Sequence, residues 1–320
     1  MGGNVPFLIA AVASLILTPI VITAAPRLGL VDRPGPMKVH TNAIPLAGVA
    51  VAFAAGIGVL TSDAGGRTWL LVAIAVATAT GLLDDLRAIR PLPRLLLQAA
   101  AGVALVASGA ELHPLGVFGG VGLVLVTVAA ANAVNMVDGQ DGLAPGLVAI
   151  AGMGLAVLVL GGPGGAAPLA AAGAACVFLV WNHSPARAFL GDGGAYGLGV
   201  LLAAGTAEAS ASGWPGLLAG GACLGVFAYE LLSTVVRRLA RRTSALAGDR
   251  DHAYDRLAAR VGSRTTSTYL MWTAGAAAVL IGLAIAEIAP STGLVAIAVA
   301  TAIAVAIHVR LGSPVSEAER

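Results

Sequence analysis

The sequence predicts an all-α polytopic membrane protein, and three observations lead to that prediction. Of its 320 residues, 58% are hydrophobic and only 11% are charged, whereas about 25% are charged in ordinary globular chains. The mean hydropathy is +0.91, and apolar runs close to membrane-spanning length recur along the chain. These values exclude a water-soluble domain, a disordered chain and a disulfide-bonded scaffold. The net charge is +2 and basic residues lie beside the apolar runs, so nucleic acid is not an expected partner.

Eleven apolar runs reach or approach the roughly 20 residues that a helix needs to cross the hydrocarbon of a bilayer. Several are short and rich in Ala and Gly, which allow neighbouring helices to approach closely. We therefore expect a compact bundle of about 10–11 transmembrane helices. In chain order the runs are Val5–Ala25, Ala43–Ser62, Thr68–Leu83, Leu95–Ala110, Gly119–Ala133, Leu147–Gly161, Ala167–Trp181, Tyr196–Ala211, Pro215–Val236, Ser267–Glu287 and Thr292–Val309.

The positions of the basic residues predict the orientation of the bundle. When the loops between the eleven runs are assigned alternately to two sides, every Lys and Arg except Arg67 falls on one side. The positive-inside rule makes that side cytoplasmic, with the N-terminus outside. We expect one integral domain over residues 1–312 of an inner or plasma membrane protein and a short cytoplasmic tail at 313–320. Its cytoplasmic loops are expected at about 26–42, 84–94, 134–146, 182–195 and 237–266.

Most of the carboxylates fall on the same predicted cytoplasmic side as the basic residues. Acids at the ends of spans are costly near lipid unless they bind a cation or a partner. This density of both signs predicts that a charged ligand is handled on that face. Four segments hold the clearest patterns, namely Gly81-Leu-Leu-Asp84-Asp85, Asn132-Ala-Val-Asn135-Met-Val-Asp138-Gly-Gln-Asp141-Gly, Phe189-Leu-Gly-Asp192-Gly-Gly and Arg250-Asp-His252-Ala-Tyr254-Asp255.

Each of these segments alone also has an ordinary structural explanation as a solvated helix end, a turn or a cap. Together they supply oxygen ligands without a Cys or His cluster, which suits Mg²⁺ or Mn²⁺ better than zinc. Glycines beside the acids permit close backbone approach to a phosphate. The combination is typical of phosphoryl transfer, in which positioning and charge neutralisation dominate. The Walker pattern of a P-loop ATPase is absent from the sequence.

The motifs resemble those of the polyprenyl-phosphate N-acetylhexosamine-1-phosphate transferases. This family includes phospho-MurNAc-pentapeptide translocase and the undecaprenyl-phosphate GlcNAc-1-phosphate transferases. The matching elements follow the family order from about residue 30 to residue 260. They are Pro36-Met-Lys38-Val-His40, Gly81-x-x-Asp84-Asp85 with Arg94 and Gln98, Asn132-x-x-Asn135-x-x-Asp138-Gly-x-Asp141-Gly, Phe189-x-Gly-Asp192-Gly-Gly, and Arg250-x-His252.

The resemblance implies transfer of an N-acetylhexosamine-1-phosphate from a UDP-sugar to undecaprenyl or decaprenyl phosphate. UMP is released with Mg²⁺ or Mn²⁺ present, as the first membrane step of cell-envelope polysaccharide synthesis. It implies metal ligation by Asp192 and Asn135. One of the two adjacent acids of the first motif would hold the acceptor, act as base, or form a covalent phospho-sugar. The implied catalytic residues are Asp84, Asp85 and Asp138, and those implied to bind nucleotide or substrate are Lys38, His40, Asn132, Asp141, Phe189, Arg250 and His252. We also consider a homodimer.

The chain departs from the family pattern where many relatives carry His-x-His-His, because it has His252-Ala-Tyr254-Asp255. The Arg250-x-His252-x-Tyr254 form looks more like that of O-antigen and capsule initiators with modified donors. The resemblance thus implies either UDP-GlcNAc or a modified sugar nucleotide of the N-acetylfucosamine or N-acetylquinovosamine type as donor. Two alternatives to the transferase are a cation-coupled secondary transporter and an inactive scaffold of the same fold. Transporter sites lie near the bilayer midplane, whereas these acids lie at span ends. A scaffold has no need to retain all the motif aspartates.

Overall fold

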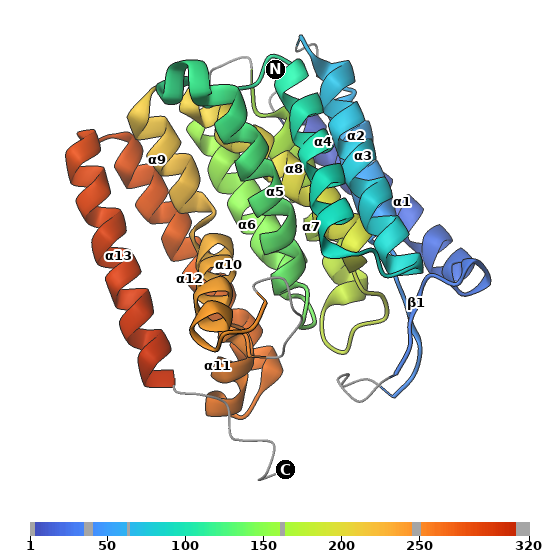
Figure 1. The fold of residues 1–320 in the computed structure, drawn as a ribbon. Helices are drawn as coiled ribbons and strands as arrows, with labels where there is room; N and C mark the ends of the chain where they lie inside the picture. Colours follow the sequence, from blue (N-terminus) through green and yellow to red (C-terminus); the bar gives the residue numbers. More distant parts are fainter. Residues whose placement is uncertain (1–3, 35–40, 63–64, 161–163, 245–250, 312–320) are drawn as a thin grey trace.

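A computed structural model describes residues 4–34, 41–62, 65–160, 164–244 and 251–311 (Figure 1). Helices dominate these ranges and the strands amount to one short hairpin, which confirms the predicted all-α class. In chain order the elements are α1 (Val5–Leu28), β1 (Val31–Asp32), β2 (Ile44–Pro45), α2 (Gly48–Val59), α3 (Arg67–Leu86), α4 (Pro91–Ala107), η1 (His113–Phe118), α5 (Gly119–Val137), α6 (Leu143–Leu158), α7 (Ala166–Asn182), α8 (Gly191–Ser210), α9 (Trp214–Cys223), α10 (Gly225–Ala240), α11 (Ala253–Val261), α12 (Arg264–Ala286) and α13 (Pro290–Leu311).

The helices include several that can cross a membrane unaided. Within the described ranges, five helical segments are long and apolar enough to do so, and α9 with α10 would make a sixth if this bent pair is one span. Helices α2, α4, α6 and α7 are apolar but shorter. Each of the eleven predicted runs coincides with one helix or with the α9–α10 pair. The chain is thus a polytopic membrane protein, while the number of spans and their orientation stay predictions.

Helix α8 lies at the centre of the bundle, with α3, α5, α2, α9, α6 and α7 packed around it (Figure 1). Nearly all of its residues are buried. Its sequence from Gly193 to Ala207 consists of small, apolar or aromatic residues on every face, as expected for a helix surrounded by other helices rather than by lipid. Because α8 is held from all sides, its first turn offers a rigid platform at one end of the bundle.

The ninth predicted run, Pro215–Val236, is not one straight helix. It breaks at Leu224, and α10 leaves the direction of α9 by 72°. Three glycines, Gly220, Gly221 and Gly225, flank the break. Glycine weakens a helix and is a common site of sharp kinks. The bend directs α10 towards α11 at the end of the bundle where the β1–β2 hairpin also lies (Figure 1).

The helices extend into the loops that the sequence predicted. Helix α3 continues to Leu86, α8 already begins at Gly191, and the expected loop 237–266 contains α11. Asp84, Asp85 and Asp192 therefore lie on helices rather than on loops. The physical reason is that Asp84 and Asp85 accept backbone N–H groups near the end of α3 and the start of α8, as described below. The tail at 313–320 lies outside the described residues.

Candidate active site

The first turn of α8 packs directly against the last turns of α3. At Gly81 a Cβ would lie 2.2 Å from the carbonyl oxygen of Asp192, so only a glycine allows this approach. One turn later, Asp85 uses both carboxylate oxygens on the same backbone. It accepts the N–H groups of Asp192 and Gly193, each at 3.0 Å. The glycine and the carboxylate of the Gly81-x-x-Asp84-Asp85 motif therefore act together to seat α8.

Asp138 completes the contacts to the start of α8. It is the residue at which α5 ends, and its Oδ2 accepts the N–H of Gly191 at 2.9 Å. Burial raises the pKa of Asp138 well above its ordinary value, and the negative charges of Asp192 and Asp85 act in the same direction. Three successive amides at the N-terminus of α8, which no helical carbonyl can satisfy, are thus bound by carboxylates from α3 and α5.

Asp84 has three partners of its own. Its Oδ1 accepts the N–H of Ile89 at 2.7 Å, which fixes the turn between α3 and α4. Its Oδ2 forms an ion pair with the Arg94 guanidinium at 3.0 Å. The same oxygen lies 3.3 Å from the Tyr196 hydroxyl. The two adjacent acids of the motif thus face different partners, Asp85 the backbone of α8 and Asp84 a cationic side chain.

The predicted metal-binding pair, Asp192 and Asn135, lies in direct contact. The Asn135 side-chain amide donates to Asp192 Oδ1, and Asp192 Oδ2 lies 3.5 Å from the Tyr196 hydroxyl. One turn earlier on α5, the Asn132 amide donates to Gln98 Oε1 at 2.6 Å. Asn132 and Asn135 are three residues apart on α5, so both lie on one face of that helix.

The donor atoms around Asp192 fit a hard divalent cation that is completed by a substrate. In the part of the chain that the structure describes, no three His, Cys, Asp or Glu side chains form a metal-binding group. Mg²⁺ does not require such a cage, because it usually takes one or two carboxylates and fills its shell with phosphates and water. Asp192 supplies a carboxylate. The side-chain amide of Asn135 has an oxygen, Oδ1, beside its donating nitrogen, and this oxygen can serve as a second ligand.

Asp141 ties the α5–α6 turn to the chain that leads into α8. Its Oδ2 accepts the N–H of Ala186 at 3.0 Å, and its carbonyl accepts the Thr268 hydroxyl at 3.1 Å. Asn182, buried at the end of α7, accepts the N–H of Gly142 at 3.0 Å. The sequence analysis missed Asn182, because an amide at the end of an apolar run is typical of a cap.

Phe189 lies three residues before Asp192, half-buried, on a backbone segment held by the β1–β2 hairpin. Its N–H donates to the Pro45 carbonyl, and its carbonyl accepts the N–H of Ala47, both at 2.9 Å. The hairpin that follows α1 therefore holds the approach to α8 in place. This keeps the aromatic side chain beside the start of α8.

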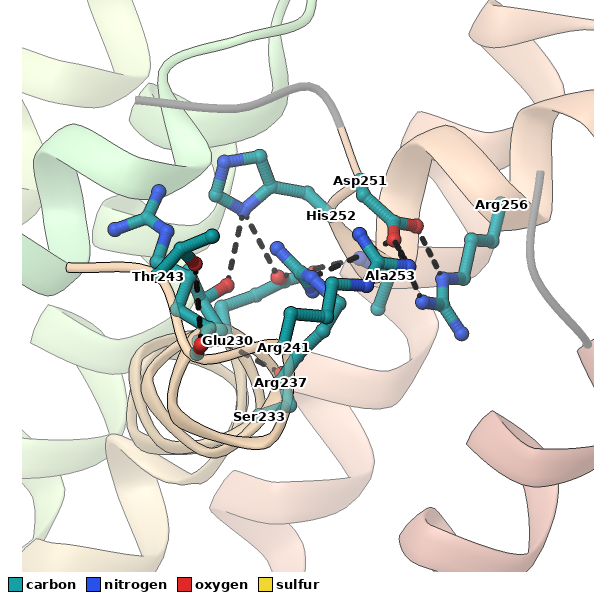
Figure 2. Close-up of polar contacts among 11 residues, drawn as sticks. Glu230, Ser233, Arg237, Arg241, Thr243, Asp251, His252, Ala253 and Arg256 are labelled. Atoms are coloured by element: carbon teal, nitrogen blue, oxygen red, sulfur yellow. Dashed lines mark hydrogen bonds and ion pairs between the residues drawn. The ribbon is translucent and has the colours of Figure 1, made fainter. Parts of the chain in front are cut away.

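A second polar cluster joins α10 to α11, and Figure 2 shows it. Glu230 of α10 is fully buried and accepts the N–H groups of Ala253 and Tyr254, each at 3.3 Å. His252, 7% exposed, places Nδ1 3.5 Å from Glu230 Oε2. The predicted substrate residue His252 is thus held at the N-terminus of α11 by an acid from α10.

Tyr254 docks α11 onto the end of α5. Its hydroxyl donates to the Met136 carbonyl at 3.2 Å, and a Cβ at Gly139 would lie 2.0 Å from that hydroxyl oxygen. The Tyr254 ring also stacks on His252, with centroids 5.2 Å apart. Tyr254 therefore connects the α10–α11 cluster to the turn that carries Asp138.

Asp251 collects three arginines in the same cluster (Figure 2). Arg256 binds both of its oxygens at 2.6 and 3.0 Å, Arg241 lies at 2.8 Å and Arg237 at 3.5 Å. Burial alone would raise the pKa of Asp251, but the hydrogen bonds and charges of these arginines outweigh it and lower the pKa. This ion-pair group fixes the chain just before His252.

The structure thus brings Asp84, Asp85, Asp138, Asn135 and Asp192 together at one end of the bundle. It places Asn132, Asp141, Phe189 and His252 on the elements that frame this group. Lys38, His40 and Arg250 lie outside the described residues. Tyr196 was missed by the sequence analysis. Its spacing of four residues from Asp192, one helical turn, is the signal that could have found it.

Comparison with known proteins agrees with this site. Residues 68–209, which carry most of its acids, match the family described as Glycosyl transferase family 4. The chain is 28% identical to the probable undecaprenyl-phosphate N-acetylglucosaminyl 1-phosphate transferase of Bacillus subtilis (strain 168), covering 85% of this chain and 81% of that protein. It is 31% identical to the decaprenyl-phosphate N-acetylglucosaminephosphotransferase of Mycobacterium leprae (strain TN), covering 78% and 75%.

A shorter match is stronger within its bounds. Over 40% of this chain, and 35% of the relative, the sequence is 43% identical to the phospho-N-acetylmuramoyl-pentapeptide-transferase of Synechococcus sp. (strain CC9605). The long matches cover the bundle, and the family match covers α3 to α8 almost completely. The chain therefore belongs to glycosyl transferase family 4, the family of polyprenyl-phosphate hexosamine-1-phosphate transferases that its motifs resemble.

Proposed function

We propose that this protein transfers an N-acetylhexosamine-1-phosphate from a UDP-sugar to undecaprenyl or decaprenyl phosphate and releases UMP. The observation that supports it most is the convergence of Asp84, Asp85, Asp138 and Asp192 on the first turn of α8. Phosphoryl transfer depends on such fixed charges around the reacting groups. The names of the long matches, which are transferases acting on polyprenyl phosphates, support the same activity.

The cofactor belongs to the proposal, with Asp192 and Asn135 as the residues that would hold Mg²⁺ or, in its place, Mn²⁺. When bound, the cation would neutralise charge on the diphosphate and on the departing UMP. The Asn135 amide orients the Asp192 carboxylate from α5, so the two ligands are already side by side. Partners of this kind commonly decide metal affinity as strongly as the ligand itself.

The reaction would be an attack by an acceptor phosphate oxygen on the β-phosphorus of the UDP-sugar. The bond between that phosphorus and the bridging oxygen breaks, and UMP leaves with the oxygen. A phosphate monoester has its second pKa near 6, so the acceptor is largely dianionic at neutral pH and needs no strong base. The protein then has to hold the acceptor phosphate and the diphosphate of the UDP-sugar close together. Cationic groups can do this, because they offset the repulsion between the two anions.

Arg94 is suited to hold one of those anions. Its guanidinium pairs with Asp84 through one terminal nitrogen at 3.0 Å. Its buried Nε has no hydrogen-bond partner in the described part of the chain. A buried donor without a partner is costly, and a bound phosphate oxygen would satisfy it. Arg94 would therefore bind a substrate phosphate beside the acids.

The hydrogen bonds of the two adjacent acids favour direct transfer over a covalent intermediate. Both oxygens of Asp85 accept amides of α8, and both oxygens of Asp84 accept donors from Ile89, Arg94 and Tyr196. Either carboxylate would have to give up a partner before attacking phosphorus. Trapping of a labelled Asp adduct during turnover would instead establish the two-step route.

The donor sugar is proposed as N-acetylglucosamine or a modified N-acetylhexosamine of the fucosamine or quinovosamine type. The departure at Tyr254 and Asp255 supports this choice, because the segment from His252 to Asp255 carries one imidazole, His252, with Tyr254 stacked on it. The predicted charge distribution puts the site on the cytoplasmic face, where UDP-sugars are present. The lipid-linked product would enter cell-envelope polysaccharide synthesis.

Membranes that contain the protein, incubated with Mg²⁺, undecaprenyl phosphate and a panel of radiolabelled UDP-N-acetylhexosamines, test the proposal. Release of UMP together with a lipid-soluble labelled diphosphate is the expected result. Uptake of label into vesicles without chemistry would establish a transporter. If neither UMP release nor uptake is observed, the protein would be an inactive scaffold. Omission of the lipid is the matched control, because hydrolysis of the donor alone does not depend on the acceptor.

A further inference from the structure

Tyr196 is a fully buried tyrosine on α8, one turn after Asp192. Its hydroxyl lies between two carboxylates from different helices, 3.3 Å from Asp84 Oδ2 and 3.5 Å from Asp192 Oδ2. Ordinary O–H···O distances are about 2.7–2.8 Å, so the hydroxyl lies at a similar distance from both without closing on either. A phenol has only one proton to donate. The hydroxyl therefore faces two acceptors with one hydrogen bond to give.

The two carboxylates reach different parts of the site. Asp84 pairs with Arg94 of α4, and Asp192 is held by Asn135 of α5. Tyr196 thus stands in the middle of a path of polar contacts that runs from α4 through α3 and α8 to α5. A change in the partners of Asp84 alters how strongly its carboxylate accepts the hydrogen bond of the phenol. When the phenol no longer donates to one carboxylate, it can donate to the other.

We propose that Tyr196 is a positioning residue that couples the orientation of Asp192 to the partners of Asp84. The inference rests on the proposed function, because it gives Asp192 the role of cation ligand. In the free protein the phenol is shared between the two acids. When a cation engages Asp192, the phenol would donate to Asp84 Oδ2, the oxygen that Arg94 also binds, so that cation binding at Asp192 changes how firmly Asp84 holds the arginine.

The decisive experiment is a double-mutant cycle on cation affinity in purified protein. Mn²⁺ binding is titrated by electron paramagnetic resonance with UMP at saturation, for the wild type, Y196F, D84N and the double variant. Y196F keeps the ring and removes only the hydroxyl, and we expect it to weaken Mn²⁺ binding about tenfold. The effect of D84N should differ at least about threefold between the wild-type and Y196F backgrounds, since residues that share a partner are not additive.

Two controls make each outcome informative. Y269F removes a hydroxyl that bonds only to His183 in the described structure, and it should leave Mn²⁺ affinity unchanged. The thermal unfolding of Y196F, measured beside it, shows whether the ring alone maintains the fold. If Y196F fails to fold, the same Mn²⁺ titration is made with Y196W, which retains a hydrogen-bond donor, alone and combined with D84N. Non-additive effects of the two substitutions would support the coupling, and additive effects would overturn it.

The outcomes separate this inference from the function beneath it. Equal Mn²⁺ affinity in the wild type and Y196F, or strict additivity in the cycle, would overturn the role of Tyr196 while the transferase stands. If Asp192→Asn leaves Mn²⁺ binding unchanged, Asp192 is not a metal ligand. This result would overturn the metal-binding role of Asp192 and, with it, the present inference.

Discussion

Gly81 of α3 and Asp192 of α8 lie so close that no side chain fits between them, since a Cβ on Gly81 would meet the Asp192 carbonyl oxygen at 2.2 Å. The same pair of helices is bridged one turn later by Asp85. Close packing and hydrogen bonding therefore fix the amino-terminal end of α8 from one side. The spacing within the Gly81-x-x-Asp84-Asp85 motif follows from this, because positions four apart on a helix share a face.

Gly81→Ala should separate α3 from α8 and disturb the site. We expect a loss of about 3 kcal/mol in stability, at the upper end of overpacking costs because the clash is with backbone, and loss of transferase activity. Gly221→Ala is the matched control, because nothing lies within 4 Å of a Cβ there, and a helical alanine should be neutral or slightly stabilising. Apparent melting temperatures in detergent measure both. Equal melting temperatures would contradict the close packing.

Asp192→Asn should abolish turnover, by about 100-fold or more, while the protein still inserts and folds. The substitution removes a charge from the predicted cation ligand but retains the shape of the side chain. Activity is measured as UMP release, and folding by size-exclusion chromatography of the purified variant. Glu287→Gln, at the far end of α12, is the control for loss of one carboxylate elsewhere. Full activity of the Asn variant would remove Asp192 from the metal role.

Glu230→Gln should loosen the start of α11. The carboxylate accepts two backbone N–H groups there, and an amide can accept with only one of its two ends. Hydrogen–deuterium exchange should rise at residues 253–261, with a cost of about 1–3 kcal/mol for the buried group left unsatisfied. Glu208→Gln is the matched control, because its parent carboxylate uses one oxygen for the N–H of Gly165 and an amide oxygen can still accept that N–H, so exchange at the start of α7 should stay close to that of the wild type. Unchanged exchange over α11 in Glu230→Gln would refute the claim that Glu230 holds the start of this helix.

Asp251 predicts a pH-dependent stability. Its pKa is lower in the folded protein than its usual 3.8, so its contribution is complete above that value and is lost as the pH falls through the folded pKa. Asp251→Asn should lower stability at pH 7 by about 2 kcal/mol, less than for a fully buried pair because Arg241 is half-exposed.

The test is thermal unfolding of both proteins between pH 3 and pH 7. The difference between wild type and Asp251→Asn should shrink as the pH falls below about 3.8. A difference that stays constant over this range would mean that the pKa of Asp251 is the same in the folded and the unfolded protein, so that the arginines do not lower it.

Much of the site could be predicted from the sequence, because its acids lie at the ends of apolar runs. Alternation of the runs assigns those ends to one side, and Asp84, Asp85, Asp138 and Asp192 do meet at one end of the bundle. The asparagines on α5 could be placed by helical spacing. The pairing of Asn135 with Asp192 was suggested by the resemblance and is a direct contact.

Other features could not be read from local patterns. Tyr196 lies in an Ala- and Gly-rich run and has the pattern of a core residue until α3 brings Asp84 to its hydroxyl. The break at Leu224 leaves the average hydropathy of its run unchanged, so one continuous span was the natural prediction. Helix α11 is short, and its place in the bundle is set by Glu230 and Tyr254, through contacts that its own sequence does not reveal. These contacts are set by tertiary packing.

The seating of α8 has a consequence for how substrates are recognised. Many phosphate-binding proteins leave the amino end of a helix open for the ligand. Here that end is already occupied by the chain's own side chains, Asp85 and Asp138. A diphosphate that approaches this end of α8 meets the carboxylate oxygens of Asp85 and Asp138, whereas such proteins offer free amide N–H groups. Positive charge for recognition must then come from outside α8, and Arg94 of α4, which pairs with Asp84 beside these acids, is one such source.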